Sequence, residues 1–132
     1  MVVLLAIQQS DYVIIPAQPS AADVEEAVAT IAVVAAAEKS VRRKIPYGVL
    51  WTRVPVMRSR ETAALFDQIA AAGYPVLGQV IDRTAYKSLF SYCTTLDQLS
   101  SDDVPGLDKA IPETEALADA VTASILEHQK AA

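Results

Sequence analysis

The sequence has little of the chemistry on which most enzymes and secreted domains depend. Its 132 residues include one cysteine, Cys93, and one histidine, His128. A single cysteine excludes an intrachain disulfide and a cysteine-rich metal site, and it suits a reducing, cytoplasmic environment. A single histidine close to the C-terminus provides no Ser-His-Asp or Cys-His arrangement. We therefore expect no catalytic residue and no metal ligand within this chain.

Aromatic residues and net positive charge are also scarce. Aromatics make up 6% of the chain, whereas hydrophobic residues make up 52%, so the core must consist mainly of Val, Ile, Leu and Ala. The net charge of −5 argues against a protein that coats nucleic acid with its whole surface. The opening VVLLAI is too short for a membrane span and has no basic segment before it, so we expect neither a span nor an export signal.

Glycine is limited to four positions, and two of them have the separation of a phosphate-binding loop. Gly73 and Gly78 lie in GYPVLGQV, but Gln79 occupies the place of the P-loop lysine. The residues between the two glycines are typical of a strand rather than of an exposed loop. We therefore expect no phosphate cradle here.

What the chain does contain is an alternation of apolar runs and helical patterns. Strands are predicted near residues 11–15, 47–54 and 75–81, because these runs are short, apolar and rich in β-branched residues. Helices are predicted near residues 21–38, 60–72, 84–92 and 112–128 from apolar residues at helical spacing. Ser20 and Ser59 suit N-caps, and Gly73 suits a helix stop. Residues 94–111 are predicted as loop, and residues 2–9 fit a strand or the end of a helix.

This order predicts an α/β fold, with a parallel sheet that carries helices on both faces. Residues 1–132 form one domain, which resembles the second half of a larger α/β domain, so one sheet edge should lie open.

Three segments resemble the ParA/MinD-type P-loop ATPases, which carry a deviant Walker A motif. SDYVIIPAQPS (residues 10–20) is similar to that family's strand before a Pro-x-x-Pro corner. VLWTRVP (residues 49–55) and AAAGYPVLGQVIDRTAYKSLF (residues 70–90) resemble two later segments, in the same order and spacing. The resemblance implies the C-terminal portion of such an ATPase domain, a partial P-loop NTPase (Rossmann-like) fold.

The resemblance also implies a function for the whole family protein. ATP and Mg²⁺ would join two subunits into a homodimer that binds DNA non-specifically, in plasmid or chromosome partition or in DNA transfer. A ParB-like or transfer-machinery partner would stimulate hydrolysis. The family's phosphate loop and magnesium ligands do not occur in these 132 residues, so this chain should be inactive alone.

By the same resemblance, Thr52, Arg53 and Asp82 are candidates for the wall beside the nucleotide base. Thr52 stands where the family often has asparagine, and one hydroxyl reads fewer base atoms than an amide does. For Arg53 the alternative is an ion pair at the end of a strand. For Asp82 the alternative is an N-cap for the helix that begins near Thr84.

The cations of the middle third are candidate DNA contacts. Arg43, Arg58, Arg60, Arg83 and Lys87 could neutralise phosphates, with Arg83 the foremost because it matches the family pattern. Ordinary solvated loop charges are the alternative for this set.

The corner residues Pro16, Gln18 and Pro19 would face the nucleotide and the dimer partner, or simply form a strand-to-helix turn. Two further hypotheses for the whole chain are a non-enzymatic α/β interaction module and an unrelated α/β enzyme. The absence of a convergent acid–base set counts against the enzyme.

Overall fold

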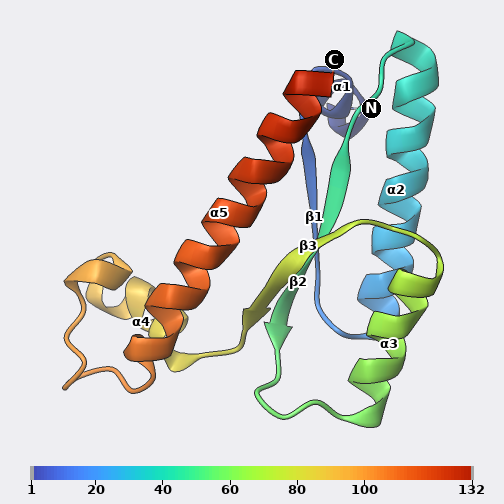
Figure 1. Cartoon of the computed structure of the whole chain (residues 1–132). Helices are drawn as coiled ribbons and strands as arrows, with labels where there is room; N and C mark the ends of the chain where they lie inside the picture. Colours follow the sequence, from blue (N-terminus) through green and yellow to red (C-terminus); the bar gives the residue numbers. More distant parts are fainter. Residues whose placement is uncertain (1, 132) are drawn as a thin grey trace.

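Three parallel strands form the centre of the structure, a computed structural model that describes residues 2–131 (Figure 1). The strand order is β1-β2-β3, which confirms the predicted α/β fold with a parallel sheet. The elements are α1 (Val2–Gln8), β1 (Val13–Ala17), α2 (Ala21–Val41), β2 (Tyr47–Val54), α3 (Arg60–Ala71), β3 (Val76–Ile81), α4 (Thr84–Tyr92), the 3-10 helix η1 (Leu96–Gln98) and α5 (Leu107–Ala131).

One face of the sheet is covered by α2 and α3, which form the main core with it (Figure 1). Ile15, Val49 and Trp51 are buried on this face against Val24 of α2 and Ile69 of α3. Burial of the aliphatic side chains in this group contributes about 1.5–3 kcal/mol each. The core therefore depends on the apolar runs that identified the strands in the sequence.

Local capping sets the ends of α2 and α3. The Ser20 hydroxyl accepts a hydrogen bond from the Asp23 amide at 3.2 Å, and the Ser59 hydroxyl accepts one from the Thr62 amide at 3.1 Å. Gly73, just beyond α3, has a φ of 79°, a left-handed conformation that glycine adopts without strain. These residues occupy the capping and stop positions expected from the sequence.

The other face of the sheet is covered by α5, which lies across β3 and reaches back toward β1 (Figure 1). The His128 ring, near the end of α5, meets the Tyr12 ring edge-on with centroids 5.8 Å apart. Burial raises the pKa of the Tyr12 phenol, and a hydrogen bond with Ser124 opposes that shift. Helices therefore lie on both faces, as predicted.

Gly48 permits close packing beneath α5. A Cβ atom at this position would lie 2.6 Å from Leu77 Cγ and 2.7 Å from the Tyr12 hydroxyl oxygen. We expect Gly48→Ala to lower the free energy of unfolding by about 1 kcal/mol, at the low end for overpacking because both neighbours are side chains that can rotate. Urea denaturation checks this value. A variant as stable as the wild-type chain would contradict the close packing.

Residues 2–9, which fit either a strand or a helix end in the sequence, form the short helix α1. Its Ile7 packs in a second small core with Val34, Ala37 and Ile45. The Arg43 guanidinium donates hydrogen bonds to the backbone oxygens of Gln8 at 2.8 Å and of Ser10 at 3.2 Å. Arg43 therefore ties the end of α1 to the end of α2, at the amino ends of β1 and β2.

The first strand lies two residues later than the sequence suggested, at Val13–Ala17 rather than 11–15. Pro16, expected in the corner after the strand, is inside it and pairs in register with Leu50. The backbone N–H of Val13 donates to the Pro46 carbonyl oxygen. Because successive residues of a strand direct their backbone N–H and C=O groups to opposite sides, the nitrogen of Pro16 faces away from β2, toward the open edge of the sheet. A proline lacking an N–H is compatible with a strand there.

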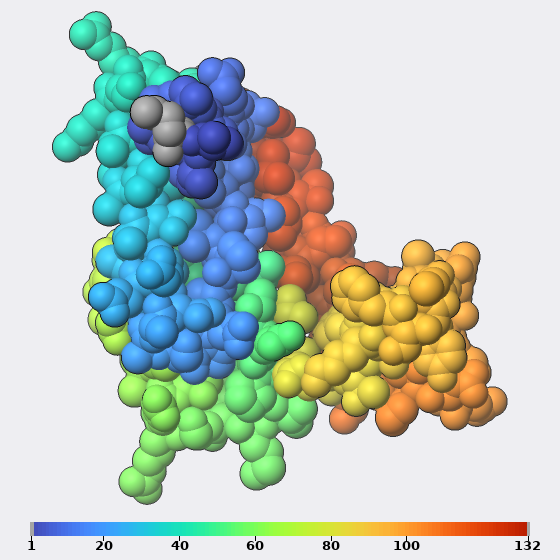
Figure 2. Space-filling model, turned by 180° about the vertical axis from the view of Figure 1, so that it is seen from behind, coloured from blue at the N-terminus to red at the C-terminus, as the bar shows by residue number. Residues whose placement is uncertain are grey.

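The segment 94–111, predicted as loop, contains η1 and the first turn of α5, which begins at Leu107 rather than near 112. Val104, Leu107 and Ala110 are buried against Ala85 of α4. This tertiary burial extends the helix through Pro112, which removes one backbone donor. We call residues 84–111 the α4 lobe; Figure 2 shows it projecting beside the sheet.

No helix among residues 2–131 is both long enough and apolar enough to cross a membrane.

Candidate functional site

The three predicted base-side residues lie together at the carboxyl ends of β2 and β3. Thr52, Arg53 and Asp82 line one hollow of about 370 Å³. The α4 lobe forms its other side, with Tyr86, Lys87 and Phe90; Val80, Ile81 and Arg83 complete the lining. In open α/β sheets, ligands bind in crevices outside the carboxyl ends of the strands. The hollow therefore occupies the place where this kind of fold holds small molecules.

An irregularity in β2 sets the position of Thr52 and Arg53. The pairing of β2 with β3 shifts between Trp51 and Val54, and Arg53 has a φ of 49°, a left-handed conformation that is unusual for a residue other than glycine. The Asp82 amide donates to the Val54 oxygen at 2.8 Å, which restores the link between the two strands. Bulges of this kind redirect side chains, and strained backbone is common at functional sites.

Asp82 lies on the edge of the hollow and forms an ion pair with Lys87 of α4. The carboxylate and the ammonium nitrogen are 3.4 Å apart, and both side chains are exposed. The alternative role for Asp82, N-cap of α4, is wrong: Arg83 occupies the cap position, and no side chain caps this helix. Among the ion pairs within residues 2–131, none involves Arg53.

Arg83, predicted as the foremost DNA contact, is held by an acidic side chain of α5. Its Nε and Nη2 atoms lie 2.9 and 2.5 Å from the two carboxylate oxygens of Glu113. The hydrogen bond from Arg83 lowers the pKa of the Glu113 carboxyl, and the same bond raises the pKa of Arg83. Only 16% of the Arg83 side chain is exposed, so this cation joins α4 to α5 and has little surface to offer a ligand.

The remaining cations divide between the two ends of the sheet. Arg58, Arg60 and Lys87 follow the carboxyl ends of β2 and β3, whereas Arg43 lies at the amino ends. The Arg58 guanidinium stacks 4.7 Å above the Phe66 ring and donates to the Gln79 side-chain oxygen at 2.7 Å. Because Arg43 lies at the opposite end of the sheet, a single flat surface includes at most Arg58, Arg60 and Lys87.

The corner after β1 is held by its own helix cap. The backbone N–H of Gln18 donates to the Asp23 carboxylate at 2.9 Å. The backbone N–H of Ser20 donates to the backbone carbonyl oxygen of Gln18 at 2.8 Å. Pro19 lies between these two residues. These local hydrogen bonds account for the corner as a strand-to-helix turn. The corner lies at the carboxyl end of β1, and its predicted role in facing the nucleotide stays a proposal.

Sequence reasoning missed Tyr86 and Phe90 as residues of the hollow, and Glu113 as the partner of Arg83. The Tyr86 hydroxyl lies 3.4 Å from the Ala110 backbone oxygen, which supports the contact between α4 and α5. One signal was available: Lys87 and Phe90, three residues apart, share a helical face. No signal connects Arg83 with Glu113, 30 residues away.

Within residues 2–131 there is no cluster of three or more His, Cys, Asp or Glu side chains suited to a metal ion. The hollow therefore holds groups that could contact a base, but no set of magnesium ligands lies beside it in this part of the chain.

Comparison with known proteins gives two informative likenesses, and no protein-family model matches. The chain is 31% identical over 124 residues to the protein named ParA from Rhizobium radiobacter, and the match covers 92% of this chain and 55% of that protein. The solved structure of apo McdA from Cyanthece aligns with a TM-score of 0.66 at 21% identity, over 87% of this chain and 46% of that one.

The chain thus spans about half the length of the relatives it matches. The McdA likeness concerns the fold alone, while the ParA likeness extends along almost the whole sequence. Together they confirm the resemblance predicted from the three motifs: this chain has the sequence pattern and the partial P-loop NTPase-like fold of one portion of a ParA/MinD-type protein.

Proposed function

We propose that this chain is the C-terminal, base-side portion of a ParA-like ATPase that acts in plasmid or chromosome partition or in DNA transfer. The observation that carries the proposal is the convergence of Thr52, Arg53 and Asp82 on one hollow at the carboxyl ends of adjacent parallel strands. Asp82 is about 30 residues from Thr52 and Arg53 in the sequence, and the fold brings all three to the edge where open α/β sheets bind ligands.

In this proposal the chain supplies the wall for the base, and the phosphates are held elsewhere. The Thr52 hydroxyl can exchange one hydrogen bond with a base edge, and Asp82 can accept one from an amino group. ATP and Mg²⁺ would bind fully only beside the P-loop half that the family resemblance implies. ATP-dependent formation of a homodimer, and its release by a ParB-like or transfer-machinery partner, would likewise depend on that half.

Non-specific DNA binding is assigned to the cations at the carboxyl edge, namely Arg58, Arg60 and Lys87, with smaller contributions from Arg43 and Arg83. Arg60 and Lys87 have exposed side chains, whereas Arg83 is held by Glu113. Each phosphate contact releases counterions, so affinity should fall steeply with salt.

We expect Arg60→Glu with Lys87→Glu to weaken retention of the chain on non-specific duplex DNA at low salt several-fold. The slope of log affinity against log salt should fall by about 1 for each lost contact. Fluorescence anisotropy with a labelled duplex measures both quantities. Lys39→Glu with Lys130→Glu is the matched control, because these two exposed lysines lie on the last turns of α2 and α5, far from the carboxyl edge (Figure 1). Equal losses in both variants would point to a general charge effect and would contradict the assigned surface.

A second candidate is a non-enzymatic interaction module, favoured by the open edge of β1. Ile14 of this strand and Val2, Val3 and Leu5 of α1 are exposed apolar side chains. Exposed strand edges and apolar patches often mark contacts with another protein. A stable monomer that is indifferent to both nucleotide and DNA would favour this alternative over the ATPase assignment.

A further inference from the structure

Phe90 stands out among the residues of the hollow, because it is an aromatic side chain left almost fully in water. Its side chain is 87% exposed, yet it lines the same hollow as Thr52, Arg53 and Asp82. The other phenylalanine of the chain, Phe66, packs against Trp51 with ring centroids 4.5 Å apart. An exposed large apolar side chain at a concave site indicates contact with a ligand more often than it does elsewhere on the surface.

The groups around Phe90 define what it could contact. Lys87 lies one helical turn before Phe90 on the same face of α4, and its ammonium group is 3.4 Å from the Asp82 carboxylate. Thr52 and Arg53, near the end of β2, line the same hollow. With Tyr86 and Arg83 counted, the hollow combines two aromatic side chains, two hydroxyl-bearing side chains, one carboxylate and three cations.

Contacts between α4 and α5 fix the orientation of the helix that carries Phe90. Arg83, at the start of α4, is bound to Glu113, and the Tyr86 hydroxyl contacts the Ala110 backbone oxygen and the Thr114 hydroxyl at 3.4 and 3.3 Å. Ala85 is fully buried in the core of the α4 lobe. Phe90 is therefore presented by a helix that is anchored to α5, which limits the entropy lost when a ligand binds.

We propose that Phe90 is the stacking platform of the hollow, on which the planar ring of a purine nucleotide rests. This inference rests on the proposed function and adds the residue that would hold the base from one side. A flat π-system gains from stacking on an aromatic ring, largely independent of base identity. Thr52 and Asp82 would then contact the edge of the same ring.

The two phenylalanines make a direct test possible. The 132-residue chain, labelled with ¹³C at phenylalanine, is titrated with millimolar AMP and its ring signals are followed by NMR. Phe90→Leu identifies the Phe90 signals, and Phe66 reports on the intact fold. We expect AMP to move the Phe90 ring signals upfield in a saturable way and to leave those of Phe66 in place. Ribose 5-phosphate, which has no base, should leave Phe90 unmoved.

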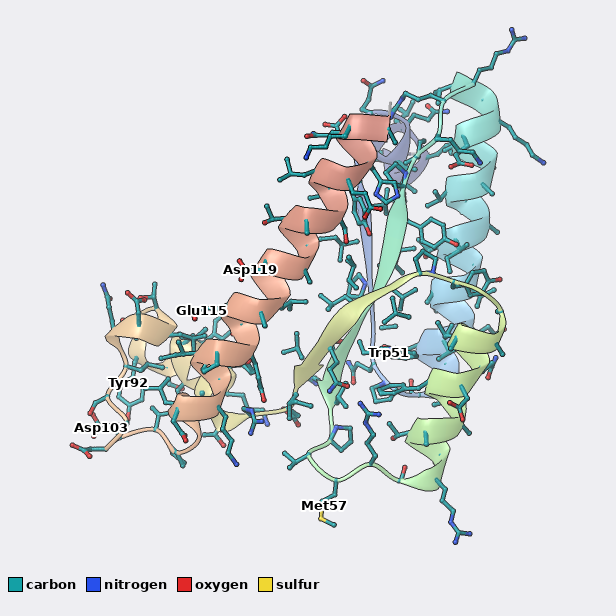
Figure 3. The ribbon with its side chains drawn as sticks, in the orientation of Figure 1. Trp51, Met57, Tyr92, Asp103, Glu115 and Asp119 are labelled. Carbon is teal, nitrogen blue, oxygen red and sulfur yellow. The ribbon has the colours of Figure 1, made fainter. Side chains whose placement is uncertain are left out.

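Two variants give the expected change in affinity. Phe90→Leu should weaken AMP binding about fivefold to tenfold, followed through the backbone amides of Thr52 and Asp82. Tyr92→Ala is the matched control, because Tyr92 is an exposed aromatic residue on the same helix that does not line the hollow (Figure 3). The Tyr92→Ala variant should bind AMP with the same affinity as the unaltered chain.

The possible outcomes separate this inference from the proposed function. AMP shifts at Thr52 and Asp82 without a Phe90 ring shift would overturn the stacking role and leave the base site standing. Equal shifts with ribose 5-phosphate would also overturn it. Movement of the Phe90 signals with protein concentration alone would assign the ring to a contact between copies of the chain. No shift at any residue of the hollow would overturn both the stacking role and the base-side assignment.

Discussion

Replacement of Trp51 by alanine should lower the free energy of unfolding by about 3–5 kcal/mol, the usual range for loss of a large buried aromatic side chain. Trp51 is 3% exposed and lies between the sheet and α3, where its ring packs on Phe66 with centroids 4.5 Å apart (Figure 3). Domains of this size have a total stability of about 5–15 kcal/mol, so the loss is a large fraction of the whole.

Urea unfolding followed by circular dichroism at the helix band measures this change without relying on the tryptophan signal. Met57→Ala is the control: Met57, at the tip of the loop after β2, is 86% exposed and should change stability by no more than about 0.5 kcal/mol (Figure 3). If both variants unfold at the same urea concentration, Trp51 is not a core residue and the packing of α3 against the sheet is wrong.

Loss of Glu113 should give the second largest effect among the changes considered. Glu113→Ala leaves the Arg83 guanidinium, 16% exposed, without its partner. Removing one partner of a buried pair costs about 3–5 kcal/mol, and exposed pairs contribute about 0–1 kcal/mol. Because 34% of the Glu113 side chain is in solvent, we expect an intermediate loss of about 2 kcal/mol.

The effect of Glu113 should depend on pH in a defined direction. The hydrogen bond from Arg83 lowers the pKa of Glu113 in the folded state. A lowered folded-state pKa means that the contribution to stability is complete above the ordinary glutamate pKa and is lost as the pH falls through the lower value. The difference in unfolding free energy between the unaltered chain and Glu113→Gln should therefore be largest near neutral pH and should shrink in acid.

Glu115→Ala is the matched control for this pair. Glu115 is an exposed glutamate two residues further along α5, on the outer side of the helix (Figure 3). It should change stability by less than about 0.5 kcal/mol at every pH. A Glu113 variant that behaves like the Glu115 variant would show that the ion pair does not anchor α4 to α5.

Features set by residues close together in the chain could be predicted from the sequence. The hydroxyls of Ser20 and Ser59 accept hydrogen bonds from backbone amides three residues further on. Gly73 ends α3 through its own left-handed backbone conformation, which requires no distant contact. The apolar runs of β2 and β3 likewise located both strands in the sequence. The three motifs identified the family resemblance because their order is a property of the sequence itself.

Features decided by distant contacts could not be predicted. The first turn of α5 forms where Val104 and Leu107 are buried against Ala85, although Pro112 suggested a later start. The strand β1 continues through Pro16 because that position faces the open edge of the sheet. In each case burial or edge position outweighed a local preference that amounts to a few kcal/mol.

The candidate site shows the same division. Sequence alone placed Thr52 and Arg53 near the carboxyl end of one strand and Asp82 directly after the next, and parallel strands end at one edge of a sheet. Only the tertiary structure decided that Glu113 neutralises Arg83 and that Phe90 completes the hollow from the α4 lobe. The reason is physical: strand order follows from local periodicity, whereas the pairing of side chains 30 residues apart depends on how α4 and α5 pack after the sheet has formed.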